Sequence, residues 1–201
     1  MPDERSVDWS RALWRTALAL PALVMIAPVL SGGEPWRQAI RPTGEFGAML
    51  LIAALAISPL QTILPNAAWV AWLRHRRRDI GLAAFLYTLL HLIVFSASIG
   101  RLDWIVQGIA FASMWTGWLA FGLLAAVAAI SNEGAMRRLG PWWKRVQRLA
   151  YPAALLTLAH WLLLTRSPVE GLLYFAPLTL LQALRVWITL RAQLRTERDR
   201  P

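Results

Sequence analysis

The chain has 201 residues, of which 57% are hydrophobic and 16% are charged, and its net charge is +10. Soluble domains average about 45–50% apolar and about 25% charged residues, so a lipid bilayer is the expected environment. The 12 Trp exclude a disordered chain. The absence of Cys excludes disulfide scaffolds, iron–sulfur clusters and Cys-ligated zinc or haem.

Six apolar stretches, rich in Ala and Leu, are long enough or nearly long enough to cross about 30 Å of hydrocarbon as helices. The fifth is the shortest. Residues 102–111 are too short to span, and we expect an interfacial helix or the start of the fourth span there. The sequence thus predicts an all-α fold, an integral membrane six-helix bundle. Its expected spans are residues 12–30, 46–65, 80–99, 112–130, 149–165 and 169–190.

The first stretch has a signal peptide as its alternative interpretation. Acidic residues precede it, and no small-x-small cleavage pattern stands out at its end. These features favour a helix that is retained in the mature protein.

The positive charges lie in short clusters between the apolar stretches, which argues against a nucleic-acid partner and for loop charges that set orientation. With the N-terminus inside, 17 of the 21 Lys and Arg fall in inside segments and four in outside segments. This asymmetry predicts an even number of crossings with both termini in the cytoplasm. The expected organisation is a cytoplasmic N-terminus at residues 1–11, a six-helix transmembrane domain at 12–190, and a frayed cytoplasmic tail at 191–201.

Two of the three His residues lie inside expected spans, where ionisable residues are costly and usually functional. His91 follows Arg78 by 13 residues, and His160 follows Arg148 by 12 residues. At about 1.5 Å per residue, both lie roughly 18–20 Å from the inner basic rim. Two imidazoles at one depth, on helices that run in the same direction, can ligate haem iron from its two sides.

Two other interpretations of these His residues stay open, a proton relay or transport role and simple packing with hydrogen bonds to carbonyls. Few acidic residues fall inside the spans, which counts against an ion-coupled transporter. Trp residues near the span ends are expected to anchor the protein at the membrane interface. No internal repeat is visible.

The basic segment RHRRRDIG (74–81) is interpreted as an inner loop that sets orientation. Arg77 and Arg78 are also candidates to contact haem propionates or a flavin phosphate, because Arg binds such groups in a bidentate manner. His75 lies among these Arg residues in wet, cationic surroundings, and we do not expect it to be a ligand.

Three segments, residues 43–60, 77–92 and 139–161, resemble the MsrQ (YedZ) family. The segment TGEFGAMLLIAALAISPL (43–60) is similar to the family's second-helix signature. The segment RRDIGLAAFLYTLLHL (77–92) resembles its third helix, with the basic pair, Gly81 and the His at matching spacing. The segment LGPWWKRVQRLAYPAALLTLAHW (139–161) resembles its fourth loop and fifth helix. The resemblance covers about residues 10–190, with six spans in order.

This resemblance implies a ferric-reductase-like transmembrane domain that binds haem b, and FMN has been associated with the family. His91 and His160 match the family's intramembrane haem ligands. The resemblance also implies a bacterial inner-membrane subunit that receives electrons from the respiratory chain, through a quinol or a flavin. It passes them to MsrP, a periplasmic molybdopterin enzyme that reduces methionine sulfoxide in proteins, so the sulfoxide reduction belongs to the partner.

One position departs from the family pattern. The family usually has a third His 13 residues before the helix-five ligand, where this chain has Gln147. An amide is a poor haem ligand, so we expect one haem per chain rather than two.

Two competing functions remain. One is a stand-alone ferric or quinone reductase of the same fold, which would need a flavin and nicotinamide domain that the short tail after the sixth span cannot form. The other is a small non-haem transporter or structural membrane subunit.

Overall fold

A computed structural model of the chain describes residues 9–101, 110–165 and 167–198, and the regular structure of these residues is entirely α-helical. Five of the described helices (α1, α2, α3, α5 and α9) are long and apolar enough to cross a membrane. The helices are α1 (Trp9–Leu30), α2 (Trp36–Ile63), α3 (Ala68–Ile99), α5 (Ala112–Ala129), α6 (Glu133–Leu139), α7 (Pro141–Gln147), α8 (Ala150–Leu164) and α9 (Pro168–Arg198).

Each of the six expected apolar stretches corresponds to one of these helices. α8, which corresponds to the fifth stretch, has only 15 residues, whereas about 20 are needed to cross the hydrocarbon core. The all-helical membrane architecture is therefore confirmed, and a sixth crossing remains a prediction. The expected interfacial segment 102–111 lies mostly outside the described residues.

Two expectations about the polar segments are wrong. Residues 74–81 form no loop, because α3 begins at Ala68 and continues through the basic segment. Residues 191–198 continue α9 as a helix rather than fraying. Arg, Leu, Gln and Glu are good helix formers, and long Arg side chains reach water from a helix that extends past the membrane.

Two short helices, α6 and α7, lie between α5 and α8, where the sequence indicates only a loop. The Asn132 side chain caps α6 by accepting a hydrogen bond of 2.8 Å from the Ala135 N–H. Gly140, with a φ of +49°, ends α6, and Pro141 begins α7. A positive φ suits Gly, and Pro fits the first turn of a helix because its missing N–H has no partner there.

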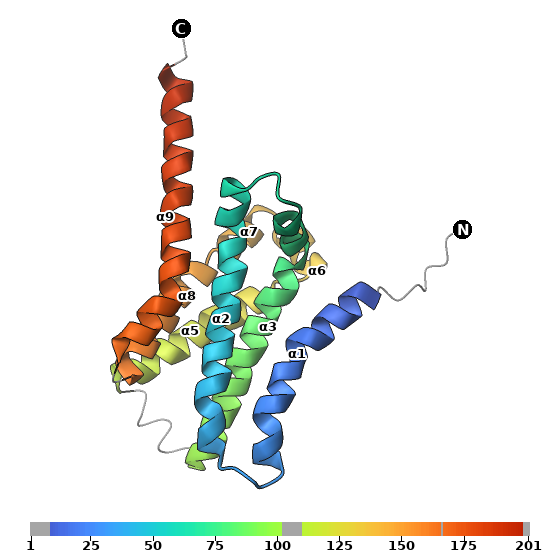
Figure 1. Ribbon diagram of the computed structural model, residues 1–201, viewed down its shortest axis with the longest axis vertical. Coiled ribbons are helices and arrows are strands. Elements are labelled where there is room, and N and C mark those ends of the chain that lie inside the picture. Colours follow the sequence, from blue (N-terminus) through green and yellow to red (C-terminus); the bar gives the residue numbers. More distant parts are fainter. Residues whose placement is uncertain (1–8, 102–109, 166, 199–201) are drawn as a thin grey trace, which may run out of the picture.

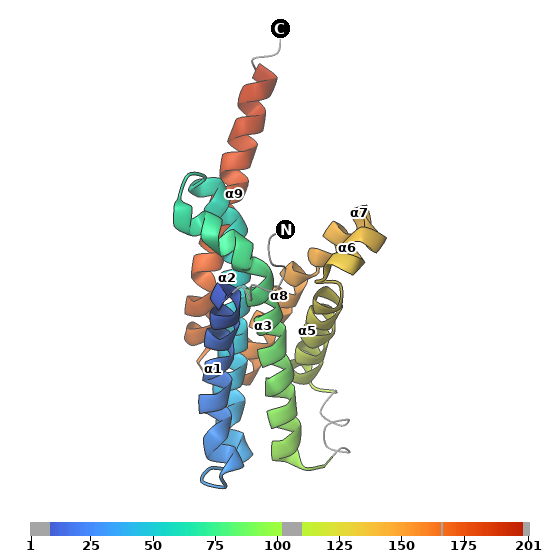
Figure 2. The same cartoon turned by 90° about the vertical axis from the view of Figure 1, so that its right-hand side faces the viewer.

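The turns between the long helices lie at two opposite ends of the molecule (Figure 1). We call the end that carries the α2–α3 turn, the α6–α7 pair and the C-terminal part of α9 the basic end. The α1–α2 and α8–α9 turns lie toward the opposite end. Figure 2 shows α6 and α7 beyond the end of α5, and α9 extending past the other helices.

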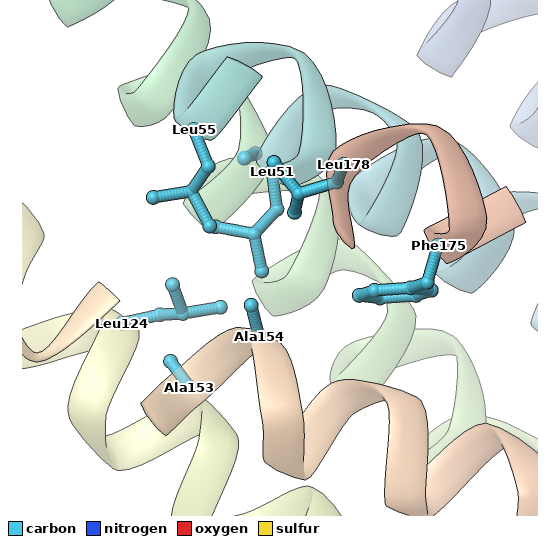
Figure 3. Packing of buried hydrophobic residues seen from close by; sticks show 8 residues of the cluster. Leu51, Leu55, Leu124, Ala153, Ala154, Phe175 and Leu178 are labelled. Carbon is cyan, nitrogen blue, oxygen red and sulfur yellow. The ribbon is translucent and has the colours of Figure 1, made fainter. Parts of the chain in front are cut away.

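The main hydrophobic core joins α2, α3, α5, α8 and α9, and Figure 3 shows its side chains pointing toward one another. Small residues let the helices approach closely, since Ala84 and Ala153 are both completely buried. Leu51 belongs to this core and also lines the cavity described below. The core members are Leu51, Leu55, Ala84, Leu124, Ala153, Ala154, Phe175 and Leu178.

A proline inside α2 helps to attach α9. Pro59 has no N–H, so the carbonyl of Leu55, four residues earlier, loses its helical partner. The Gln182 side chain of α9 donates a hydrogen bond of 3.4 Å to that carbonyl. A neighbouring helix thus satisfies the carbonyl that the proline frees, as an apolar environment requires.

Candidate functional site

The two intramembrane His residues face one cavity. His91 lies on α3 and His160 on α8, and their ring centres are 6.4 Å apart with the ring planes nearly perpendicular. The cavity has a volume of about 690 Å³, and both rings line it. Its walls come mainly from apolar and small residues, and its size falls within the range of about 300–1,000 Å³ typical of small-molecule and cofactor sites.

Backbone carbonyls hold both imidazoles. Nδ1 of His91 lies 2.9 Å from the carbonyl oxygen of Ile40 on α2. Nδ1 of His160 contacts the carbonyl oxygen of Ser113 on α5 in the same way. A carbonyl only accepts, so Nδ1 carries the proton and donates in each ring. Each neutral ring therefore keeps its Nε2 lone pair for another partner.

Two glycines make these contacts sterically possible. A Cβ atom at Gly44 would lie 2.9 Å from Nδ1 of His91, and one at Gly117 would lie 2.7 Å from Nδ1 of His160. Separations this short are closer than van der Waals contact. Gly44 and Gly117 therefore let each imidazole lie directly against the backbone of the facing helix.

A charged cluster lines the cavity toward the opposite end. Arg41 of α2 binds Glu45 one turn later, and its Nη2 also lies 2.7 Å from Oε2 of Glu170 at the start of α9. These three side chains together carry a net charge of −1. The two carboxylates are of the type that an ion-coupled transporter needs, but both are bound to Arg41.

The basic candidates from the sequence lie elsewhere. Neither Arg77 nor Arg78 is among the described residues that line the cavity. Both are exposed, and Nε of Arg77 donates a hydrogen bond of 3.1 Å to the Ala54 carbonyl. His75 is exposed and lies 2.7 Å from the Ala71 carbonyl of its own helix. The structure brings His91 and His160 together and keeps these three residues apart from them.

Gln147 stands at the position where the family resemblance implies a third His, and its side chain is already hydrogen-bonded. Gln147, at the end of α7, donates a hydrogen bond of 3.0 Å from Nε2 to the Ser131 hydroxyl. Gln147 is not among the described residues that line the cavity. Its amide therefore links the end of α7 to Ser131 at the basic end of the molecule and does not contact the His cavity.

Sequence reasoning missed Gly44, Gly117 and the charged cluster. A signal for the glycines was present, because each follows a Thr within or just before an expected apolar span, and a mid-helix Gly costs about 1 kcal/mol relative to Ala. Such a Gly usually marks a close packing contact. The charged cluster had no comparable signal, because Arg41 and Glu170 lie on different helices.

The donor set fits a haem. Metal–imidazole bonds of about 2 Å place two opposed nitrogens about 4 Å apart, and ring centres 6.4 Å apart are compatible with that spacing. Metal-bound His usually donates its other N–H to a carbonyl or a carboxylate, as both of these rings do. Within the described residues no group of three or more His, Cys, Asp or Glu is placed to hold a bare metal ion.

Comparisons with known proteins identify the family of the chain. Residues 43–158 match the family described as "Ferric reductase like transmembrane component". The chain is 35% identical over 163 residues to the protein-methionine-sulfoxide reductase heme-binding subunit MsrQ of Rhodospirillum rubrum, covering 77% of this chain and 75% of that one. It is 34% identical over 174 residues to the MsrQ of Xanthomonas campestris pv. campestris, covering 83% and 77% respectively. The family match over more than half of the chain and these identities show that the chain belongs to the MsrQ family of ferric-reductase-like transmembrane proteins.

Proposed function

We propose that this chain is the haem-binding membrane subunit of a methionine sulfoxide reductase system and acts as a cytochrome b. The observation that carries the proposal is the His91–His160 pair, with both Nδ1–H groups bound to carbonyls and both rings facing one cavity with mainly apolar walls. The names of the relatives, which are heme-binding subunits of protein-methionine-sulfoxide reductases, support the same function.

In this proposal His91 and His160 would together hold the iron of one haem b through their Nε2 atoms. The bound haem supplies reversible one-electron transfer at its iron. The Ile40 and Ser113 carbonyls hold the two rings in one tautomer, and the apolar walls keep water from the ligands. The chain itself has no catalytic residue in this proposal, because the sulfoxide is reduced by the partner.

We propose that electrons enter at the basic end and leave at the opposite end. A second cavity of about 500 Å³ at the basic end is lined by Lys144, Arg145 and Arg148 together with Trp143. Cations beside an aromatic ring suit a quinol or the phosphate of an FMN as electron donor. At the other end, the His cavity is lined by the start of α9, and a periplasmic MsrP-like molybdopterin partner would bind there.

The charge distribution supports the orientation of this route. Seventeen of the 21 Lys and Arg fall in the sequence segments expected inside, which include the α2–α3 turn, the α6–α7 pair and the end of α9, so we place the basic end in the cytoplasm, with both termini, of a bacterial inner membrane. In this orientation the chain retains the proposed organisation of a cytoplasmic N-terminus at residues 1–11, a transmembrane haem domain at 12–190 and a cytoplasmic tail at 191–201.

Haem number is part of the proposal. The Gln147 amide is bound to Ser131, and an amide is a poor iron ligand, so we expect one haem per chain. Arg77 and Arg78 remain candidates for a donor phosphate or a propionate, but the cation beside the His pair is Arg41.

The direct test is a reduced-minus-oxidised visible spectrum of the purified protein. The haem assignment predicts a Soret shift and low-spin bands, whereas a transporter or structural subunit shows neither. Delivery to the partner is tested in membrane vesicles that contain the chain with or without a molybdopterin reductase subunit. Quinol-dependent reduction of protein methionine sulfoxide should require both proteins.

A further inference from the structure

The two halves of the His site repeat one pattern of residues. In each half, a helix with a Thr-Gly pair packs against a helix with a Thr-x-x-His segment. The first half uses α2 and α3, and the second uses α5 and α8. The residues are Thr43, Gly44, Thr88 and His91 in the first half, and Thr116, Gly117, Thr157 and His160 in the second.

The hydrogen bonds repeat along with the residues. In each half the His donates to the carbonyl four residues before the Gly, which is Ile40 in one half and Ser113 in the other. The second Thr of each half bonds at 2.8 Å to the carbonyl of a completely buried Ala four residues earlier, Ala84 or Ala153. The repetition means that two separate parts of the chain build the same ligand-holding unit.

A threonine hydroxyl shares each carbonyl that holds a His. Thr43 Oγ1 lies 2.9 Å from the Ile40 oxygen and 2.6 Å from the Ala39 oxygen. Thr116 Oγ1 lies 3.0 Å from the Ser113 oxygen and 2.7 Å from that of Ala112. In the described part of the chain, Thr43 and Thr116 are also the two polar residues that are fully buried.

Because the Thr hydroxyl and the His N–H share one carbonyl oxygen, the hydroxyl affects the strength of the imidazole hydrogen bond. Each hydroxyl has one proton, which it divides between the nearer carbonyl, Ala39 or Ala112, and the carbonyl that holds the His. The His-binding carbonyl oxygen has two lone pairs, and it faces this proton, the imidazole N–H and the helical N–H of the following turn. A carbonyl with several donors accepts each of them less strongly. The bond from Nδ1–H makes the ring a stronger metal ligand at Nε2, so the hydroxyl moderates that effect.

We propose that Thr43 and Thr116 are redox-tuning residues that act through His91 and His160 by sharing their carbonyl acceptors. The inference rests on the proposed function, because it concerns the potential of a haem bound between these His residues. Removing either hydroxyl strengthens the Nδ1–H bond, makes the ligand more basic and stabilises the oxidised iron. The midpoint potential of the haem then falls.

The experiment compares purified Thr43→Val and Thr116→Val proteins, and the double variant, by spectroelectrochemical titration. We expect haem content near that of the unaltered protein. The equilibrium constant for reduction should fall about threefold per site, the order expected when part of one neutral hydrogen bond is removed. The two effects should add in the double variant.

Matched controls separate this effect from general packing changes. Thr43→Ser and Thr116→Ser keep the hydroxyl and should keep the potential. Thr179→Val removes a more exposed hydroxyl that bonds at 3.1 Å to the Phe175 carbonyl, to which no described imidazole donates. It should therefore leave the potential unchanged.

The outcomes distinguish a failure of the tuning role from a failure of the proposed haem-binding function. Valine variants with full haem and an unchanged or raised potential overturn the tuning role but leave the haem assignment intact. If a valine variant loses haem, the Thr→Ala variant, which has the smaller side chain and adds no methyl group beside the carbonyls, is titrated instead. Haem loss in that variant too, with Thr179→Val unaffected, makes the role structural and overturns tuning. Unaltered protein that binds no haem overturns the proposed function itself.

Discussion

The imidazole of His91 on α3 lies beside that of His160 on α8, with ring centres 6.4 Å apart, and each ring donates from Nδ1 to the backbone of a different neighbouring helix. Each His thus depends on two helices, one that carries it and one that orients it. In the proposed function, replacing either ring would remove one of the two side chains that hold the haem iron, and we expect the helix packing to remain.

His91→Ala and His160→Ala should each abolish most haem binding while the protein still inserts into the membrane. The pyridine haemochrome assay, normalised to protein, measures the loss. His75→Ala is the control, because His75 is exposed and bonds within its own helix. A His91 or His160 variant that keeps a full haem complement and an unchanged low-spin spectrum contradicts the ligand assignment.

Gly44→Ala and Gly117→Ala should lower haem occupancy severalfold, because the added methyl would lie 2.9 or 2.7 Å from Nδ1 and must push the ring away from its carbonyl. Gly122→Ala is the matched control on α5, since no described atom lies within 4 Å of a Cβ at that position. Haem content and the absorption spectrum report the outcome. Equal haem occupancy in all three variants would contradict the prediction, because the His rings would then have moved aside for the methyl group without loss of haem binding.

The charge of the cluster at the cavity should set part of the midpoint potential. Arg41→Ala leaves Glu45 and Glu170 without their cation, and the added negative charge favours oxidised iron, so the potential should fall. Glu45→Gln should raise it. Arg37→Ala, a cation change one turn earlier and not in the cavity lining, should have the smaller effect in the same redox titration.

Gln147→His should gain haem if the rest of the family's inner site is intact. The change exchanges an amide bound to Ser131 for an imidazole that can ligate iron. The haem-to-protein ratio should rise above one, and Gln147→Asn, which adds no ligand, should leave it unchanged. Two haems per chain in the unaltered protein would remove the argument from Gln147.

Reporter fusions should place the two ends of the molecule. A fusion after the C-terminus should be active with a cytoplasmic reporter and silent with a periplasmic one. A fusion at Gly33, in the α1–α2 turn at the opposite end, should give the reverse pattern. The expectation follows from 17 basic residues in the inside segments against four outside. Reversed signals at both positions would reverse the electron route.

The sequence was informative where a residue's role depends on its own helix. The apolar stretches predicted the positions of the long helices. Counting residues from the basic rims predicted one level for His91 and His160, and their rings lie side by side in the structure. The helical state of residues 74–81 was missed, because a basic cluster looks alike in a loop and in a helix that extends past the membrane.

Contacts between helices were the part that the sequence did not reveal. Arg41 looked like an outside charge, and its bond to Glu170 depends on how α9 packs against α2. The Thr-Gly pairs at Gly44 and Gly117 could indicate close packing, but not the residue that packs there. That residue is a His on another helix, and no local pattern identifies it.

The division of the His site between two helix pairs has a thermodynamic consequence. The α2–α3 pair contributes one imidazole and the α5–α8 pair contributes the other. A ligand that bonds to both rings binds only the docked arrangement of the two pairs, so its binding and their association are linked equilibria. The bound ligand therefore acts as a reversible cross-link, and the unfolding temperature of the domain should rise with the free concentration of that ligand.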